Sequence, residues 1–347
     1  MSRLQSPQNR WEQNWNISSK KQRTQIIDGE RTIEIIQEYR ILLGDIPISA
    51  VRSYSILGPT KPPVVLIHGF AQNRYTWECT HRSASAYFAS LGFDVWNVEL
   101  RGHGLSRKEG QIGAETFDDY VTDLKNIARA LPDSAFWIGH SLGGATIYGA
   151  AATMKPLRCR GVIGLGAVFH FAQGNDFLHL LCKFTTKIFS SNTLGQLQIR
   201  TRMGGDLLSS LYGIADVAGF IFPISGWWPD SIERHILEER LQKGFDWTSF
   251  EVWKEMSKWA TEKKFPYEEE WTKINVPLYV ILGDYDHLLT PKDGRVAYDL
   301  SQSMDKEILL LNNIDHKRHW GHVDITIGKD AIDIVWAPIG KWMLERS

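Results

Sequence analysis

Short runs of apolar residues alternate with segments of helical periodicity in the first half of the chain. The runs are continuous, which is typical of strands that are buried on both faces of a sheet. The predicted strands are 64–67, 93–98, 135–138 and 161–168. The helices predicted between them are 80–91, 117–131 and 142–153. Strands and helices that alternate in this order form a parallel sheet with helices on both faces.

The alternation stops near Phe169 and resumes further along the chain. The interval 169–265 contains helical runs but no clear strand pattern, so we expect an inserted helical domain there. The pattern then predicts strands at 276–282 and 306–311, with a helix at 291–302 between them and a helix at the C-terminus. The resumed strands are expected to extend the same sheet.

The residues before the first buried strand follow a different pattern. Residues 1–30 are polar and aperiodic, and we expect a loose arm there. Two β-rich runs within 32–56 flank the turn signal Gly44-Asp45 and predict an antiparallel lead-in to the sheet. The expected division of the chain is an arm at 1–30, a first core segment at 31–168, the helical insertion at 169–265 and a second core segment at 266–347.

Composition and charge narrow the possible functions. The 347 residues include 39 Lys and Arg against 40 Asp and Glu, and this net charge of -1 disfavours nucleic acid as a partner. Three widely spaced cysteines predict free thiols in a reducing compartment. No signal-peptide pattern is present, and the apolar stretch 217–228 is shorter than the ~20 residues of a membrane-spanning helix. We therefore expect a cytoplasmic protein.

The sequence Gly139-His140-Ser141-Leu142-Gly143 fits the pattern G-x-S-x-G. It follows a predicted strand and opens a predicted helix, which is the context of a nucleophilic serine on a sharp turn. The turn is too tight for a Cβ on either side, and it exposes the Ser141 hydroxyl at the edge of the sheet. The alternative is a glycine-rich turn that carries a passive serine.

A nucleophilic serine also needs two N–H groups that face the reacting carbonyl, an oxyanion hole. Leu142 opens the helix, so we expect its N–H to be one donor. The loop after the strand 64–67 reads His68-Gly69-Phe70-Ala71. We expect the Phe70 N–H to be the other donor, with Ala71 as the second choice, and Gly69 to permit a sharp turn.

These motifs, taken in order, resemble the α/β-hydrolase superfamily. They are HGF (68–70), RGHGLS (101–106), GHSLGG (139–144), GDYDHLLTP (283–291) and WGHVD (320–324). The sequence is most similar to lipases and esterases of that superfamily, with a further likeness to the acid-lipase group. The resemblance implies an α/β-hydrolase fold, a mostly parallel sheet with helices on both faces and a helical cap inserted after the sixth strand.

The resemblance also implies a catalytic triad in the chain order serine, acid, histidine. The acid follows the seventh strand of the family, and the motif places it at Asp286, three residues after Gly283. Asp284 is the rival, and a position beside Gly283 favours a turn-forming role for it.

The matching base is His322, which would take the proton of the Ser141 hydroxyl. His316 and His319 are the competing histidines. Their regular spacing would also suit a metal site completed by Asp315 or Asp324. The triad already accounts for one of the three histidines, so we expect neither a metal nor a cofactor.

The expected activity is that of a serine hydrolase on carboxylic esters with an apolar acyl part. Ser141 disfavours some members of the superfamily, because its dehalogenases and epoxide hydrolases use Asp as the nucleophile and its polyester synthases use Cys. A thioesterase, an amidase or an acyltransferase would use the same triad. A non-catalytic binding protein on a hydrolase scaffold is the alternative from another class.

The insertion is rich in aromatic and aliphatic residues. Helix packing accounts for most of them, but an apolar cap above the nucleophile suits a small hydrophobic ester or lipid as substrate. The run 217–228 is interpreted either as buried core or as a mobile lip that contacts a membrane or lipid interface transiently.

Overall fold

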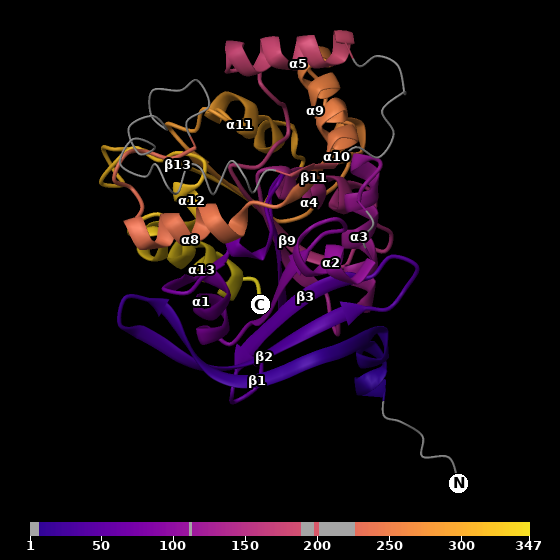
Figure 1. The fold of residues 1–347 in the computed structure, drawn as a ribbon, viewed down its shortest axis with the longest axis vertical. Helices are drawn as coiled ribbons and strands as arrows, with labels where there is room; N and C mark the ends of the chain where they lie inside the picture. Colours follow the sequence, from indigo (N-terminus) through magenta and orange to yellow (C-terminus); the bar gives the residue numbers. More distant parts are fainter. Residues whose placement is uncertain (1–6, 111–112, 189–197, 201–225) are drawn as a thin grey trace.

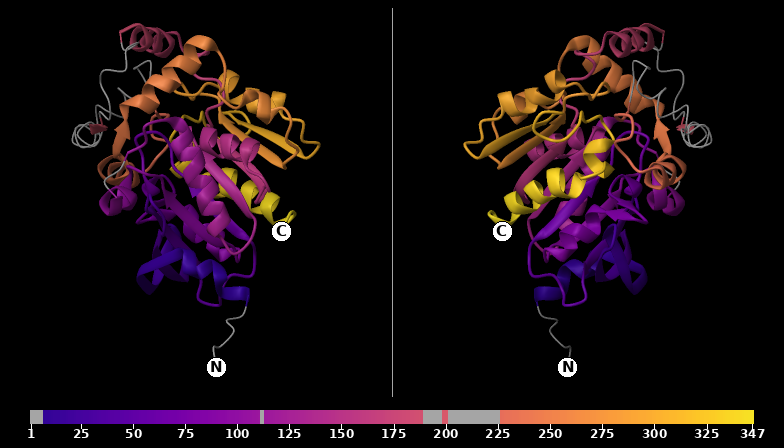
Figure 2. Two further views of the ribbon diagram at one scale, coloured as in Figure 1. Left: turned by 90° about the vertical axis from the view of Figure 1, so that its right-hand side faces the viewer. Right: turned by 90° about the vertical axis from the view of Figure 1, so that its left-hand side faces the viewer.

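One large sheet forms the centre of the molecule. The computed structural model describes residues 7–110, 113–188, 198–200 and 226–347. Within these residues, helices cover both faces of the sheet (Figures 1 and 2). The strands in spatial order are β13 (Lys306–Leu311), β12 (Leu278–Gly283), β9 (Cys159–Leu165), β8 (Ala135–His140), β4 (Pro63–Ile67), β7 (Asp94–Glu99), β3 (Ile48–Ser55), β2 (Arg31–Leu42), β1 (Trp15–Asp28), β6 (Arg82–Ser83) and β5 (Glu78–Cys79).

The six strands from β13 to β7 run parallel to one another, as the sequence predicts. Each of them lies within a few residues of its predicted range. Alternate side chains of β4 show why the apolar run is continuous. Val65 and Ile67 belong to the core on one face of the sheet, whereas Val64 and Leu66 belong to the core on the other face. A strand between two cores needs apolar residues at every position.

Each core is closed by its own helices. The first core packs against α3 (Phe117–Ala130), α4 (Leu142–Thr153) and α11 (Pro291–Leu300). The second packs against α1 (Ala84–Ser90), the π-helical turn η3 (Ile332–Trp336) and α13 (Ala337–Leu344). The shorter elements outside the insertion are η1 (Pro7–Asn14), η2 (Arg74–Thr76), α2 (Gly104–Gly110) and α12 (Asp324–Ile327).

The expectation of a loose arm over 1–30 is wrong for most of that range. Residues 15–28 form β1, which pairs antiparallel with β2 along almost its whole length. Most side chains of β1 are exposed, so backbone hydrogen bonds and not apolar burial hold the strand in place. A polar strand of this kind leaves no hydrophobic periodicity. The local signal of the hairpin is Gly29, a glycine in the tight turn that joins β1 to β2, where its φ is positive.

Two predicted segments differ in detail. The helix predicted at 80–91 begins at Ala84, because Ser83 pairs in the sheet and its hydroxyl accepts a hydrogen bond from the Ala86 N–H at 3.1 Å. The C-terminal helix is divided among α12, η3 and α13. The family-specific cap and the boundaries at 169 and 265 stay predictions.

The segment between β9 and β12 contains the helices expected there. They are α5 (Asp176–Ile188), α8 (Arg234–Gly244), α9 (Phe250–Glu262) and α10 (Glu268–Trp271). It also contains two short strands that the sequence pattern does not predict, β10 (Gln198–Arg200) and β11 (Trp247–Ser249), which pair with each other. Helices α5 and α9 lie at the end of the molecule opposite to β1 and β2 (Figure 1).

A buried ion-pair network joins the antiparallel lead-in to the parallel sheet. Arg52 of β3 donates two hydrogen bonds to Asp94 of β7, at 2.7 and 3.1 Å. Its third nitrogen lies 3.2 Å from the Glu38 carboxylate of β2, which also pairs with Arg40 at 2.7 Å. Burial by itself would raise the pKa of Glu38, but hydrogen bonds from Lys20, Tyr54 and Arg40 outweigh it and lower the pKa to about 2.

Replacing Arg52 with Met is expected to destabilise the fold by about 3–5 kcal/mol, because two buried carboxylates would lose their shared partner. The measurement is the free energy of unfolding in a denaturant. Arg160→Met is the control, since its ion pair with Asp133 is largely exposed and is worth about 1 kcal/mol or less. Equal losses in the two variants would contradict the assigned role of the network.

Candidate active site

Ser141 occupies a strained turn between β8 and α4. Its backbone has φ 56° and ψ −123°, a region that side chains other than glycine rarely adopt. The turn is held from two directions. The Ser141 N–H donates to the Leu165 carbonyl at 3.1 Å, and the Ser141 carbonyl accepts from the N–H groups of Val168 at 3.0 Å and Gly144 at 2.9 Å. These bonds fix the serine at the carboxyl end of its strand.

The glycines around this turn are needed for space. A Cβ on Gly139 would lie 2.4 Å from the Gly143 carbonyl oxygen, and a Cβ on Gly143 would lie 2.5 Å from the His68 carbonyl oxygen. Neither distance is compatible with a side chain. The prediction that the turn excludes a Cβ on either side is therefore confirmed.

The loop after β4 lies directly against Ser141. A Cβ on Gly69 would approach the Ser141 Cβ to 2.8 Å, so Gly69 permits close contact between the two loops. The positive φ in this loop belongs to Ala71, at 57°. In the described part of the chain, the N–H groups of Phe70 and Leu142 have no backbone acceptor. Both stay available as predicted oxyanion donors.

Asp286 and His322 form a buried pair. The His322 Nδ1 atom lies 2.6 Å from the Asp286 Oδ2 atom, and the two side chains are 4% and 0% exposed. The other oxygen of Asp286 accepts hydrogen bonds from the N–H groups of Leu288 at 3.0 Å and Leu289 at 2.7 Å. A carboxylate with these donors holds the imidazole with its proton on Nδ1 and leaves Nε2 free to accept a proton.

The competing residues form a second, more exposed pair. His319 Nδ1 lies 2.6 Å from Asp284, whose other oxygen accepts a hydrogen bond from the Trp320 N–H at 2.9 Å. His316 instead accepts a hydrogen bond from the Asn312 N–H at 3.3 Å. The three histidines have three different partners, so they do not converge on one point as metal ligands would.

His140 connects the serine turn to the histidine loop. It precedes Ser141, and its ring centroid lies 4.5 Å from that of His322. Its Nε2–H donates to the main-chain carbonyl of His322 at 2.9 Å. Burial holds the pKa of His140 well below its ordinary value, so the ring stays neutral at physiological pH. Ser141 and the Asp286–His322 pair therefore meet at one edge of the sheet.

Comparison with known proteins identifies the fold. Residues 62–182 match the family model of the alpha/beta hydrolase fold. The crystal structure of a monoacylglycerol lipase from Paleococcus ferrophilus superposes with a TM-score of 0.58 at 20% identity, over 86% of this chain and 99% of that one. The chain has the α/β-hydrolase fold. The predicted resemblance to this superfamily, and to its esterase and lipase type, is confirmed.

Curated relatives match shorter stretches of the chain. Epoxide hydrolase B of Mycobacterium tuberculosis is 32% identical over 109 residues, which cover 31% of this chain and 29% of that protein. A pimeloyl-acyl-carrier-protein methyl ester esterase of Aliivibrio fischeri is 34% identical over 135 residues, which cover 38% of this chain and 48% of that protein. The chain thus spans less than half the length of either relative.

The structure adds residues that the motifs do not reveal. Gly166 follows β9 with φ 46°, and a Cβ there would lie 3.1 Å from Asp286 Oδ2 and 3.3 Å from His322 Nδ1. It therefore leaves room for the buried pair. Its position at the end of a strand next to the G-x-S-x-G strand is the signal that could have identified it.

The insertion also contacts the site loops. Asp246 Oδ2 accepts hydrogen bonds from the Gly104 N–H at 2.7 Å and from the Asn73 side chain at 3.1 Å. The Phe70 ring lies 6.1 Å from that of Trp253 on α9. The insertion thus holds both the loop after β4 and the RGHG loop in place. Most of the apolar run 217–228 lies outside the described residues, so its role stays a prediction.

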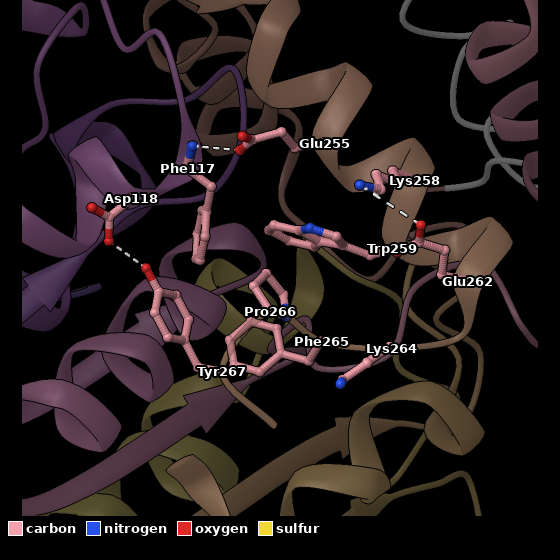
Figure 3. Close-up of a pocket in the computed structure, with 10 residues that line it drawn as sticks. All are labelled: Phe117, Asp118, Glu255, Lys258, Trp259, Glu262, Lys264, Phe265, Pro266 and Tyr267. Carbon is pink, nitrogen blue, oxygen red and sulfur yellow. Dashed lines mark hydrogen bonds and ion pairs between the residues drawn. The ribbon is translucent and has the colours of Figure 1, made fainter. Parts of the chain in front are cut away.

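A cavity of about 360 Å³ is lined by the start of α3, by α9 and by residues 264–267, which precede α10 (Figure 3). Trp259 of α9 packs edge-to-face against Phe117 in its wall, with ring centroids 4.7 Å apart. The Tyr267 hydroxyl donates to Asp118 on the same side. These aromatic residues pack the insertion against the core, so the cavity follows from helix packing.

Proposed function

We propose that this protein is a serine hydrolase that cleaves carboxylic esters with an apolar acyl part. One observation carries the proposal. Ser141, in its strained turn, is joined through His140 to the buried Asp286–His322 pair. A serine hydroxyl is a poor nucleophile until a positioned base accepts its proton, and the proposal assigns the base to His322 and the carboxylate that orients it to Asp286.

In the proposed reaction, His322 Nε2 takes the proton of Ser141 as the serine oxygen attacks the ester carbonyl. The oxygen of the tetrahedral intermediate is bound by the N–H groups of Leu142 and Phe70. The alcohol leaves with a proton returned by His322, and an acyl-enzyme forms on Ser141. Water then attacks this ester, with His322 again acting as the base, and the carboxylic acid is released.

The related proteins favour ester chemistry over epoxide opening. One relative is named for a methyl ester and one solved structure for a monoacylglycerol. The match to epoxide hydrolase B does not carry its activity over, because the superfamily's epoxide hydrolases use an aspartate where this chain has Ser141. Thioesters, amides and acyl transfer to an alcohol remain alternatives for the same triad, and a binding protein would lack a reactive serine.

Helix α5 supports contact with a lipid interface. Five large apolar side chains lie on one stripe of this helix and are 38–66% exposed: Phe177, Leu180, Leu181, Phe184 and Ile188. The lysines at 183 and 187 are exposed beside the stripe. An apolar stripe with flanking lysines is the pattern of a helix that lies on an anionic lipid surface. Among the described residues, no helix has the length and apolar character that crossing a membrane requires.

A fluorophosphonate probe is expected to label Ser141, and Ser141→Ala is expected to abolish ester turnover without a change in unfolding temperature. The labelled residue is mapped by mass spectrometry, and turnover is measured with p-nitrophenyl esters of increasing acyl length, where kcat/KM should rise above that for acetate. Ser90→Ala, an exposed serine, is the control. Turnover by the Ser141 variant would exclude this residue as the nucleophile.

Asp286→Asn is expected to lower kcat by about 10⁴, because the imidazole would lose the carboxylate that fixes its tautomer. Asp284→Asn should change kcat only a few-fold, since Asp284 pairs with His319. Both variants are compared by steady-state kinetics on the same ester. If the loss follows Asp284 instead, the assignment of the acid is wrong.

The double variant Leu180→Ser/Phe184→Ser is expected to bind anionic vesicles at least about tenfold more weakly, because about 25 cal/mol is lost for each Å² of apolar surface that no longer leaves water. Co-sedimentation with phosphatidylcholine–phosphatidylglycerol vesicles measures the partition. Leu57→Ser/Ile314→Ser, the control, removes two apolar side chains elsewhere that are even more exposed, at 89% and 87%. Similar binding by both double variants would exclude α5 as the lipid-contacting element.

A further inference from the structure

Arg240, on helix α8 of the insertion, carries a buried positive charge with little compensation. The residue is 3% exposed. One terminal nitrogen donates a hydrogen bond to the Thr76 hydroxyl at 3.2 Å, while its Nε and its other terminal nitrogen have no hydrogen-bond partner. In the described part of the chain, no carboxylate pairs with it. Burying a guanidinium without a carboxylate partner costs free energy. A functional role would account for the burial of Arg240.

Gly244, the last residue of the same helix, leaves room for the guanidinium. A Cβ on Gly244 would lie 1.7 Å from its unpartnered terminal nitrogen, so the glycine at the end of α8 makes the space that the group occupies. Burial lowers the pKa of Arg240 to about 10, and the side chain stays positively charged at neutral pH.

A chain of polar contacts leads from Arg240 to the active site. The Thr76 hydroxyl lies 2.9 Å from the end of the Gln72 side chain, and this side chain lies 3.3 Å from His140 Nδ1. Gln72 belongs to the loop after β4, two residues beyond Phe70. Its Oε1 atom lies 3.2 Å from the point that a Cβ on Gly69 would occupy, which is itself 2.8 Å from the Ser141 Cβ.

The positive charge of Arg240 affects the pKa values of two histidines near Ser141. Burial is the main reason that the pKa values of His68 and His140 lie well below the ordinary value, and repulsion by Arg240 lowers both further. Along these contacts, Thr76 alone separates Arg240 from Gln72 in the loop of Phe70. Gln72 and His140 lie between this point and His322. The charge is therefore closer, along these contacts, to the oxyanion side of the site than to the base.

We propose that Arg240 is a positioning residue of the hydrolase: its buried charge stabilises, from behind the loop of Gln72, the negative oxygen that forms when Ser141 attacks. This inference rests on the proposed function. No new bond or proton transfer is involved, because Arg240 acts only through the field of its charge and the loop that it holds.

Arg240→Gln keeps a hydrogen-bond donor for Thr76 and removes the charge. It is expected to lower kcat about tenfold with KM nearly unchanged, because a charge that acts through the protein interior stabilises the negative oxygen of the transition state and not the neutral bound ester. Binding of a trifluoromethyl ketone, whose adduct with Ser141 carries a negative oxygen, should weaken by the same factor. Binding of the matching methyl ketone should not change. Arg234→Gln, an exposed arginine of the same helix, is the control.

Arg240→Lys tests the role of the charge in a single variant, because raising the pH removes the charge of the lysine. It keeps the charge, so kcat at neutral pH should stay within a few-fold of the wild-type value. A buried lysine loses its proton at a lower pH than an arginine does. Activity of this variant should therefore fall at alkaline pH values where the wild-type enzyme keeps its activity.

Three results would overturn the proposal. The first is an Arg240→Gln enzyme with unchanged kcat and unchanged affinity for the trifluoromethyl ketone. The second is an equal loss of affinity for both ketones, which would indicate a structural role alone. The third is a lysine variant with the pH profile of the wild type. If Ser141 of the wild-type protein is not labelled by the fluorophosphonate, the proposed function falls and this inference with it; labelling with an unaffected Arg240→Gln variant removes only this inference.

Discussion

The strained turn at Ser141 is the constraint on which the rest of the site depends. A residue with this backbone geometry is strained by about 1–3 kcal/mol, and such strain persists only where the surroundings fix it. Here the Leu165 carbonyl holds the amide of the turn, and Val168 holds its carbonyl. Leu165 ends β9, which pairs with the serine strand, and Val168 lies in the loop that follows. The strained turn is therefore held by hydrogen bonds to the end of a buried parallel strand and to the loop after it.

Most glycines at this site are needed because neighbouring segments approach them closely. Unusual backbone angles account for fewer of them. Gly69, Gly143 and Gly166 each lie where a side-chain carbon would collide with the serine, with the neighbouring loop or with the Asp286–His322 pair. Only Gly166 also needs a positive φ. The loops that follow five parallel strands, β4, β8, β9, β12 and β13, can thus converge at one edge of the sheet. This convergence brings together the residues of the proposed triad, which are far apart in the sequence.

The parallel core and the candidate triad were the parts most open to prediction from sequence. Strands buried on both faces leave continuous apolar runs, and the serine, acid and histidine motifs are local patterns in a fixed order. Strand β1 could not be predicted, because exposed polar side chains leave no periodicity. The choice between Asp284 and Asp286 depends on which carboxylate faces which histidine, and the two aspartates differ by only two positions. The contact of Arg240 with Thr76 joins residues 164 apart, which no local pattern encodes.

Two of the buried arginines, Arg52 and Arg240, differ in how the surrounding residues compensate their charge. Arg52 is surrounded by Asp94 and Glu38, so its charge is neutralised where it joins β2, β3 and β7. The fold can therefore place carboxylates beside a buried guanidinium when the role is structural. Arg240 has only a hydroxyl partner among the described residues, and its field extends to His68 and His140 instead. An uncompensated charge in a low-dielectric interior acts over a longer range than a paired one. The insertion thus influences the serine site through electrostatics as well as through the loops that it holds.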